Sequence, residues 1–184
     1  MRPRHYLDIM ARGKPKPAAA AQVLRILHAA FISQPACYAL ALPEHAGSQF
    51  ACLRIFAETP EDLHQLHLYI EDEATLAAFG VVRAIKNVPT SFDGSWISYR
   101  RYRIPTRKAE RIPGGQLRIR RMLEADAMGL PFFAMRSQST GQNFRLYIES
   151  IAAEPQTEPC QPDGYGLASA TRAFALPACP CNAS

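Results

Sequence analysis

The spacing of apolar residues in the first half of the chain predicts an alternation of strands and helices. Residues 6–10 alternate as a strand does, whereas residues 18–33 repeat their apolar positions at helical spacing. Two further strand-like runs are joined by a Pro-Glu-His-Ala-Gly turn, and Thr59 and Pro60 provide a helix start. In chain order the predicted elements are strand 6–10, helix 18–33, strands 36–42 and 50–57, a helix from 59 towards 79, and strand 81–88.

This order of strand, helix, strand, strand, helix and strand is typical of the ferredoxin-like, or RRM-like, arrangement. It predicts an α+β protein, and such a frame often binds RNA but also serves many other functions. The second half predicts a strand over 96–103, a helix over 116–128 and a hairpin over 130–148. We therefore expect a ferredoxin-like domain at 1–94 and a smaller C-terminal part at 95–184 that carries this helix and hairpin.

The basic residues are concentrated in one block of the second half. Residues 100–121 contain nine Arg or Lys and one acid, Glu110, so the block carries +8 and the rest of the chain −3 of the total +5. This asymmetry indicates a polyanionic partner, although a charge run is also common on an ordinary solvated surface. Aromatic residues are interleaved with arginines over 96–103, which suits phosphates and unstacked bases.

One histidine stands at the edge of the apolar stripe of the first predicted helix. The stripe includes Leu24 and Phe31, and His28 lies on their flank. We expect His28 at the boundary between core and solvent, where a partly buried histidine satisfied by one hydrogen bond is the common outcome. His64 and His67 lie at i and i+3 on the second helix, but no acid or cysteine stands at a spacing typical of a metal site. Neither a metal nor a cofactor is expected.

The five cysteines have irregular spacings and indicate reduced thiols rather than a disulfide framework. The stretch Cys179-Pro180-Cys181 is too short for a metal site and predicts a disordered tail. A hydrophobic fraction of 48% is enough for a core, and the chain has no long apolar run or signal-peptide segment. We therefore expect a cytoplasmic protein.

The polar turn of the C-terminal hairpin is the most distinctive stretch of the chain. It runs from Arg136 to Gln142 as Arg-Ser-Gln-Ser-Thr-Gly-Gln, between strand-like runs at 132–135 and 144–148. Hydroxyl, amide and glycine residues are common turn formers, so composition alone is compatible with an ordinary solvated loop.

The eleven-residue segment 136–146, Arg-Ser-Gln-Ser-Thr-Gly-Gln-x-Phe-Arg-Leu, resembles the signature of the CRISPR repeat-RNA endoribonucleases of subtype I-F (Csy) systems. The resemblance extends to His5-Tyr-Leu-Asp-Ile9, to Leu27-His28, to an arginine-bearing helix before the signature, and to Tyr165-Gly166-Leu167. It implies a ferredoxin-like domain followed by a smaller part with the arginine helix. It also implies a protein that cuts the stem-loop of CRISPR precursor RNA without a metal and stays on the 3′ hairpin of the mature guide.

The resemblance implies an active site made of His28, Ser137 and Tyr165, the positions that match the family's histidine, first signature serine and tyrosine. Cleavage by the ribose 2′-hydroxyl needs a base, and histidine is the side chain whose ordinary pKa lies near neutrality. Ser137 would orient the hydroxyl, and Tyr165 would position the histidine or stack on a base. The expected RNA contacts are Arg101, Arg103, Arg111, Arg118, Arg120, Arg121, Ser139, Gln142 and Phe144.

Several of these expected contacts have a specific role. Ser139 and Gln142 would support the scissile phosphate or the loop. Phe144 is either the family's aromatic that stacks on a nucleotide or a core aromatic at a strand start. Arg101 and Arg103 stand where the family uses an arginine and a glutamine to read bases at the foot of the stem, and a guanidinium also suits a guanine edge.

The chain departs from the family in its arginine helix. Within that helix Arg118 and Arg121 share one face and Arg120 lies beside them, but Pro113-Gly114-Gly115 interrupts the helix upstream and arginines are fewer. The departures indicate a divergent repeat or a variant system. Two other readings are a non-catalytic subunit that caps the guide hairpin in a CRISPR effector complex, and a general RRM-like RNA-binding protein. The expected partners are repeat RNA and other effector subunits.

Overall fold

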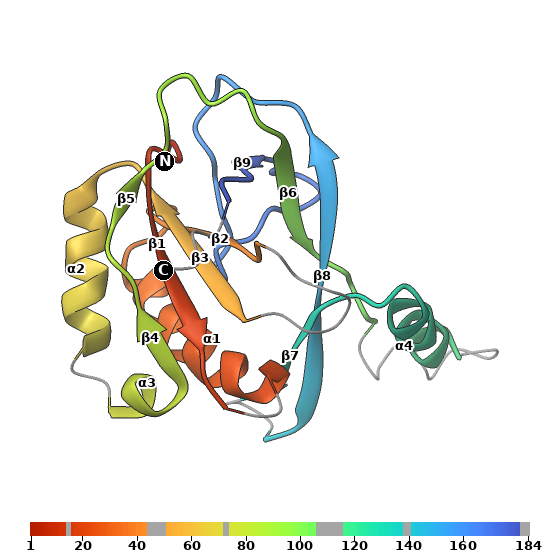
Figure 1. The fold of residues 1–184 in the computed structure, drawn as a ribbon. Helices are drawn as coiled ribbons and strands as arrows, with labels where there is room; N and C mark the ends of the chain where they lie inside the picture. The colour runs from red at the N-terminus through yellow and green to blue at the C-terminus, as the bar shows by residue number, and fades with distance from the viewer. Residues whose placement is uncertain (14–15, 44–50, 72–73, 106–115, 138–140, 181–184) are drawn as a thin grey trace.

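The computed structural model describes residues 1–13, 16–43, 51–71, 74–105, 116–137 and 141–180. In these residues the chain forms two antiparallel sheets with helices beside them (Figure 1). The predicted α+β class is therefore confirmed.

The first sheet contains the strands of the first half of the chain. Its order is β2 (Ala39–Ala41), β3 (Cys52–Ala57), β1 (His5–Ala11) and β4 (Gly80–Val82), and β5 (Lys86–Asn87) also pairs with β1. With β1 between β3 and β4, and every pair antiparallel, this is the order expected of the ferredoxin-like arrangement.

Three helices belong to this half: α1 (Lys16–Ser33), α2 (Pro60–Glu71) and α3 (Ala74–Phe79). The predicted N-cap is present, since the Thr59 hydroxyl accepts a hydrogen bond from the Asp62 backbone N–H at 3.1 Å. Both α1 and α2 pack against β1. The prediction of one helix from 59 towards 79 is wrong, because the segment forms two separate helices.

The predicted strand 81–88 is also two pieces, β4 and β5, and the register shows why. Ile9 pairs with Val82 and Tyr6 pairs with Lys86, so β1 has two residues between these pairs where the partner segment has three. The additional residue is accommodated as a bulge, which interrupts the ladder.

The second sheet contains the strands of the second half, in the order β7 (Phe132–Arg136), β8 (Asn143–Ala153), β6 (Trp96–Arg101) and β9 (Leu176–Pro177). The long strand β8 pairs with β7 through its first residues and with β6 through its last. The predicted hairpin at 130–148 is confirmed. The helix α4 (Leu117–Ala127) lies outside the sheet, at the right of Figure 1.

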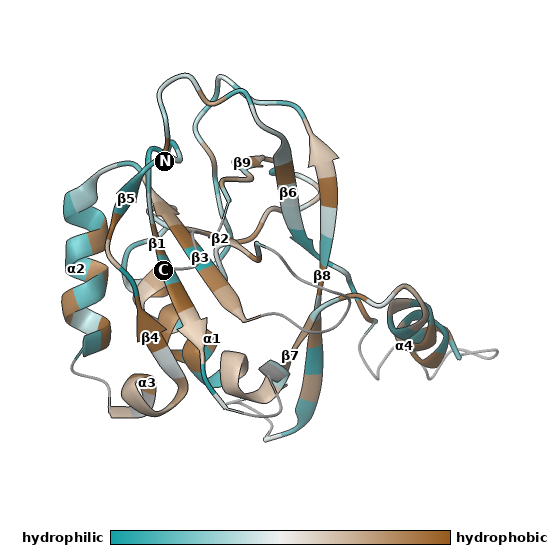
Figure 2. Cartoon of the chain, in the orientation of Figure 1, coloured by the Kyte–Doolittle hydropathy of each residue, from teal (hydrophilic) through white to brown (hydrophobic). Residues whose placement is uncertain are grey.

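A hydrophobic core with residues from both sheets connects them. One cluster of buried residues includes Leu7 and Ile55 of the first sheet together with Tyr99 and Leu146 of the second. Figure 2 shows hydrophobic residues predominating on β1 and β4, whereas α2 and α4 carry both polar and apolar residues. The division into 1–94 and 95–184 stays a prediction.

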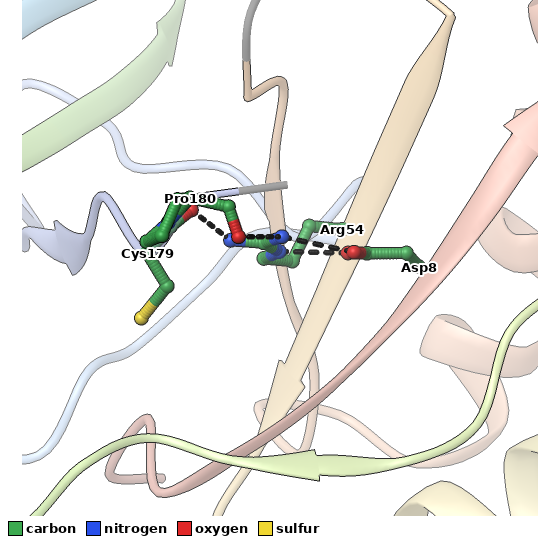
Figure 3. Close-up of polar contacts among 4 residues, drawn as sticks. All are labelled: Asp8, Arg54, Cys179 and Pro180. Atoms are coloured by element: carbon green, nitrogen blue, oxygen red, sulfur yellow. Dashed lines mark hydrogen bonds and ion pairs between the residues drawn. The ribbon is translucent and has the colours of Figure 1, made fainter. Parts of the chain in front are cut away.

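An ion pair lies inside this core. Arg54 of β3 is 1% exposed and Asp8 of β1 is 6% exposed. The Arg54 Nε lies 2.7 Å from Asp8 Oδ1, and Nη2 lies 2.9 Å from Oδ2, which is the bidentate geometry of a strong pair (Figure 3). The Arg54 guanidinium also donates to the carbonyl oxygens of Cys179 and Pro180 and lies 4.2 Å from the centre of the Tyr6 ring.

The prediction of a disordered C-terminal tail is wrong. The tail is not disordered at Cys179 and Pro180, because Cys179 is buried and both carbonyls bind the guanidinium of Arg54. The segment 164–166 forms a turn. Cys181 lies outside the described residues, and the other four cysteines are free thiols.

Candidate active site

His28 lies on α1 and is half-buried, as its place at the edge of the apolar stripe predicts. Its Nδ1 lies 2.5 Å from the carbonyl oxygen of Gly164. Because a carbonyl oxygen can only accept a hydrogen bond, Nδ1 must carry the proton. In the neutral ring the lone pair is then on Nε2, so this hydrogen bond selects the tautomer in which Nε2 can accept a proton.

The aromatic ring of Tyr165 lies flat against the imidazole of His28. The ring centres are 4.0 Å apart and the planes differ by 4°. The guanidinium carbon of Arg101 lies 5.2 Å from the centre of the same tyrosine ring. Three parts of the chain therefore meet at Tyr165: α1, β6 and the segment that follows β8.

The turn that presents Gly164 and Tyr165 is fixed by its own hydrogen bonds. Asp163 Oδ1 accepts hydrogen bonds from the backbone N–H groups of Tyr165 at 2.8 Å and Leu167 at 3.0 Å. Gly166 has a φ of +77°, and a Cβ at this position would come within 2.9 Å of the Leu40 backbone nitrogen. Glycine is required here both by the left-handed backbone and by the close approach to β2. The turn thus holds the His28 partner in a defined place.

Ser137 follows β7, the strand of the second sheet that packs against α1. Its backbone N–H donates to the carbonyl of Gln142 at 2.9 Å, and its own carbonyl accepts from the N–H of Gly141 at 2.9 Å. Gly141 has a φ of +66°, which only glycine adopts readily. These hydrogen bonds connect the two ends of the hairpin loop, and the half-buried Ser137 lies directly after β7.

A groove of about 1210 Å³ is bounded by β6, the β7–β8 hairpin and α4. Its described lining contains six arginines and two carboxylates, so it is strongly positive. The charged lining residues are Arg100, Arg101, Arg103, Arg118, Arg121, Arg145, Glu149 and Asp163. Phe144 and Tyr102 add aromatic surface to the same groove. Positive charge with interleaved aromatic surface is the combination that binds nucleic acid.

The helix α4 is attached to the sheet by a small cluster of Tyr102, Ala125 and Tyr147. Its acids bind the sheet, because Glu124 accepts from the Tyr102 hydroxyl at 2.9 Å and Asp126 accepts from the Tyr147 hydroxyl at 2.7 Å. Burial raises the pKa of both tyrosines, and the hydrogen bond from Tyr102 lowers the pKa of Glu124. These contacts orient the arginine-bearing face of the helix towards the groove.

The arginines of α4 divide into two groups. Arg118 and Arg121 line the groove, which confirms that they share one face, whereas Arg120 does not line it. Arg121 Nη1 lies 3.2 Å from Glu124 Oε2, and its guanidinium carbon lies 4.2 Å from the centre of the Tyr102 ring. Arg120 Nε lies 3.7 Å from the other oxygen of Glu124.

The other predicted site residues fall into three places. Arg101, Arg103 and Phe144 line the groove, and Phe144 also packs against the main core, so both readings of this aromatic describe part of its surroundings. Gln142 is exposed and does not line the groove. Arg111 and Ser139 lie outside the described residues.

Sequence reasoning missed two arginines and one acid of this region. Arg100 and Arg145 line the groove, with Arg100 Nε 2.7 Å from Glu149 Oε2 and Arg145 Nη1 3.0 Å from Asp126 Oδ1. Arg100 faces Glu149 in the register of β6 and β8, a pairing that an alignment of the two strands in sequence would have suggested. No sequence pattern singled out Asp163, whose role depends on the turn that it caps.

Within the described part of the chain, no group of three or more His, Cys, Asp or Glu side chains is placed to hold a metal ion. In the same part, no helix combines the length and apolar composition that crossing a membrane requires.

Comparison with known proteins identifies the family. No curated protein matches the chain. The family described as CRISPR-associated protein (Cas_Csy4) matches residues 6–178, which is nearly the whole chain and includes His28, the signature hairpin and the Tyr165 turn. This family is associated with the processing of CRISPR repeat RNA. The chain therefore belongs to the Cas_Csy4 family of CRISPR-associated proteins.

Proposed function

We propose that the protein is an endoribonuclease that cleaves CRISPR precursor RNA at the repeat stem-loop and stays bound to the 3′ hairpin of the guide. The observation that carries the proposal is the orientation of His28. Its Nδ1 donates to the Gly164 carbonyl and its ring stacks on Tyr165, which leaves Nε2 as the proton acceptor.

The reaction that fits this site uses the RNA's own 2′-hydroxyl as nucleophile. Nε2 of His28 takes the hydroxyl proton, the oxygen attacks the adjacent phosphorus, and the 5′-oxygen of the next nucleotide leaves and takes a proton from water. The products are a 2′,3′-cyclic phosphate and a 5′-hydroxyl. The imidazolium that forms is stabilised by the Gly164 carbonyl and by the face of the Tyr165 ring. Since the nucleophile is part of the substrate, no metal is required to activate a water.

The other site residues would position the RNA. Ser137 orients the 2′-hydroxyl, a role supported by its position directly after β7, the strand that packs against the helix of His28. The groove holds the stem, with Arg118 and Arg121 on phosphates and Phe144 stacking on a nucleotide at the foot of the stem. Arg101 and Arg103 read base edges there, with Arg101 next to Tyr165.

The experiment that tests this function uses one modified substrate. A CRISPR repeat hairpin is made with a single 2′-deoxy sugar just 5′ of the cut, and its cleavage is compared with that of the all-ribose hairpin. We expect both RNAs to bind equally and only the ribose substrate to be cut, with cyclic phosphate ends. Cleavage of the deoxy substrate would exclude attack by the 2′-hydroxyl.

The second candidate is a non-catalytic subunit that caps the guide hairpin in an effector complex, because the basic groove alone would serve that role. Tight binding of the ribose hairpin without any cleavage would favour this candidate. In both cases we expect other effector subunits as partners.

A further inference from the structure

A second hollow adjoins the groove along β7 and lies between α1 and the hairpin. Its volume is about 590 Å³, within the range of roughly 300 to 1,000 Å³ typical of ligand pockets. Gln22 and Arg25 of α1 line it on one side, and Arg136, Ser137 and Asn143 of the hairpin line it on the other. Arg25 and Arg136, the charged residues among the described lining of this hollow, have no role in the function proposed above.

The described residues that line this hollow include two arginines and no carboxylate, so the hollow is positively charged. This differs from the groove, where Glu149 and Asp163 offset part of the charge. Arg25 is exposed and makes no ion pair within the part of the chain that the structure describes. Arg136 uses its Nε to donate to the Gly141 carbonyl at 3.1 Å, which leaves its terminal N–H groups for a ligand.

The hollow adjoins both the groove and the residues of the proposed reaction. Ala134, Met135 and Asn143 line the groove and the hollow alike, so the two spaces meet along β7. Ser137 lines the hollow, and Arg25 lies one helical turn before His28 on α1. An RNA strand that leaves the groove along β7 and passes Ser137 therefore enters a second space whose arginines can bind phosphates.

We propose that this hollow binds the phosphates of the single-stranded RNA on the 3′ side of the cut, through Arg25 and Arg136. The inference rests on the proposed function, in which the retained product is the hairpin and the released product is the strand beyond it. Gln22 and Asn143 provide amide groups for sugar or base contacts in the same hollow. The strand across the cut would then be held in line with the 2′-hydroxyl until it is released.

The test uses hairpins that cannot be cut, each with a 2′-deoxy sugar at the cleavage position. One is bare, one carries a short single-stranded 3′ flank and one carries an equally long 5′ flank. For the wild-type protein we expect the 3′ flank to increase affinity, and to steepen the plot of log Kd against log salt by roughly 1.4, about 0.7 for each of two single-strand phosphate contacts. Arg25→Ala and Arg136→Ala should each remove about half of this additional slope and leave the affinity for the bare hairpin unchanged.

Arg83→Ala is the matched control, because Arg83 is an exposed arginine that follows β4 and lines neither space. It should retain the full effect of the 3′ flank. The affinity of each variant for the bare hairpin shows whether the variant is folded.

Three results would overturn the inference while the proposed function stands: a 3′ flank that adds no affinity, a loss in both variants that is equal for bare and flanked hairpins, or an effect of the variants on the 5′ flank only. A wild-type protein that binds none of the hairpins would instead refute the proposed function, and this inference with it.

Discussion

Two regions of the molecule hold their functional side chains differently. They are the corner made of His28, Gly164 and Tyr165, and the arginine groove. His28 is held by a backbone carbonyl and by a stacked ring, both from one turn that Asp163 and Gly166 fix. The groove arginines lie at the surface, and several of them bind the protein's own acids, as Arg100 does with Glu149.

The proposed function accounts for this difference. A group that transfers a proton must already be in position, since a small displacement is costly to the rate. An arginine that binds a phosphate must first leave its internal acid, so its net contribution is modest and many arginines must act together. Changes at the corner should therefore alter the rate at nearly constant affinity, and changes in the groove should alter affinity at nearly constant rate.

The largest expected effect is the loss of cleavage rate in the variant His28→Ala. Removal of a positioned general base should lower the single-turnover rate by roughly 10² to 10⁴-fold, while affinity for the repeat hairpin changes little. The measurement is cleavage of labelled hairpin at saturating protein. His67→Ala serves as the control, because His67 pairs with Glu71 on α2 and lines neither the groove nor the second hollow. An unchanged cleavage rate in His28→Ala would contradict the proposal that the side chains around His28 control the rate.

The second effect concerns Arg54. Its ion pair with Asp8 is buried, so no water or external ion can replace Asp8 as its partner. Arg54→Met leaves Asp8 buried without a partner and should lower the free energy of unfolding by about 3 to 5 kcal/mol. Urea unfolding measures this loss. The double variant Asp8→Leu, Arg54→Met should recover part of it, because no unpaired charge remains.

The matched control for Arg54 is Arg2→Ala, since Arg2 lies 4.0 Å from Glu58 with both side chains well exposed. Its effect should stay within about 1 kcal/mol. Equal losses for Arg2→Ala and Arg54→Met would contradict the distinction between exchangeable surface arginines and a fixed buried one.

Sequence patterns were enough to predict the α+β class, the order of elements in the first sheet and the hairpin, since each depends on local periodicity and turn residues. They failed where a partner distant in sequence decides the outcome. The strand at 81–88 is divided by its register with β1, and the tail at Cys179 is ordered by a guanidinium 125 positions earlier in the chain.

The candidate site shows the same limit. The resemblance indicated His28 and Tyr165, but their stacking and the Nδ1 contact with Gly164 depend on how α1 meets a turn 136 positions away. Helical periodicity correctly placed Arg118 and Arg121 on one face. It did not reveal that Arg120 binds Glu124 away from the groove, because that depends on where the sheet lies.

A smaller effect on rate is expected from the turn that holds His28. Asp163→Ala removes the acceptor for two backbone N–H groups, and a hydrogen bond to a charged group contributes about 1.5 to 3 kcal/mol, so the single-turnover rate should fall roughly 10-fold or more. Asp163→Asn keeps an acceptor oxygen but loses the charge, so its rate should fall less than that of Asp163→Ala. Because Asp163 also lines the groove, the rate is measured at saturating protein so that changes in affinity do not contribute. Equal rates for the two variants would show that the turn does not depend on this acceptor.

The smallest effect, and the one that tests the groove most directly, is on the salt dependence of binding. Arg118→Ala and Arg121→Ala should each reduce the slope of log Kd against log salt by roughly 0.7 to 0.9, the value for one phosphate contact. Arg120→Ala is the matched control on the same helix, because it removes an equal charge from a position that does not line the groove, and its slope should not change. Arg121 has to exchange Glu124 for a phosphate, so its loss of affinity at low salt should be modest even when its slope changes fully. The same change in slope for all three variants would mean that the helix binds RNA through its general charge, and that the face defined by Arg118 and Arg121 has no particular part in binding.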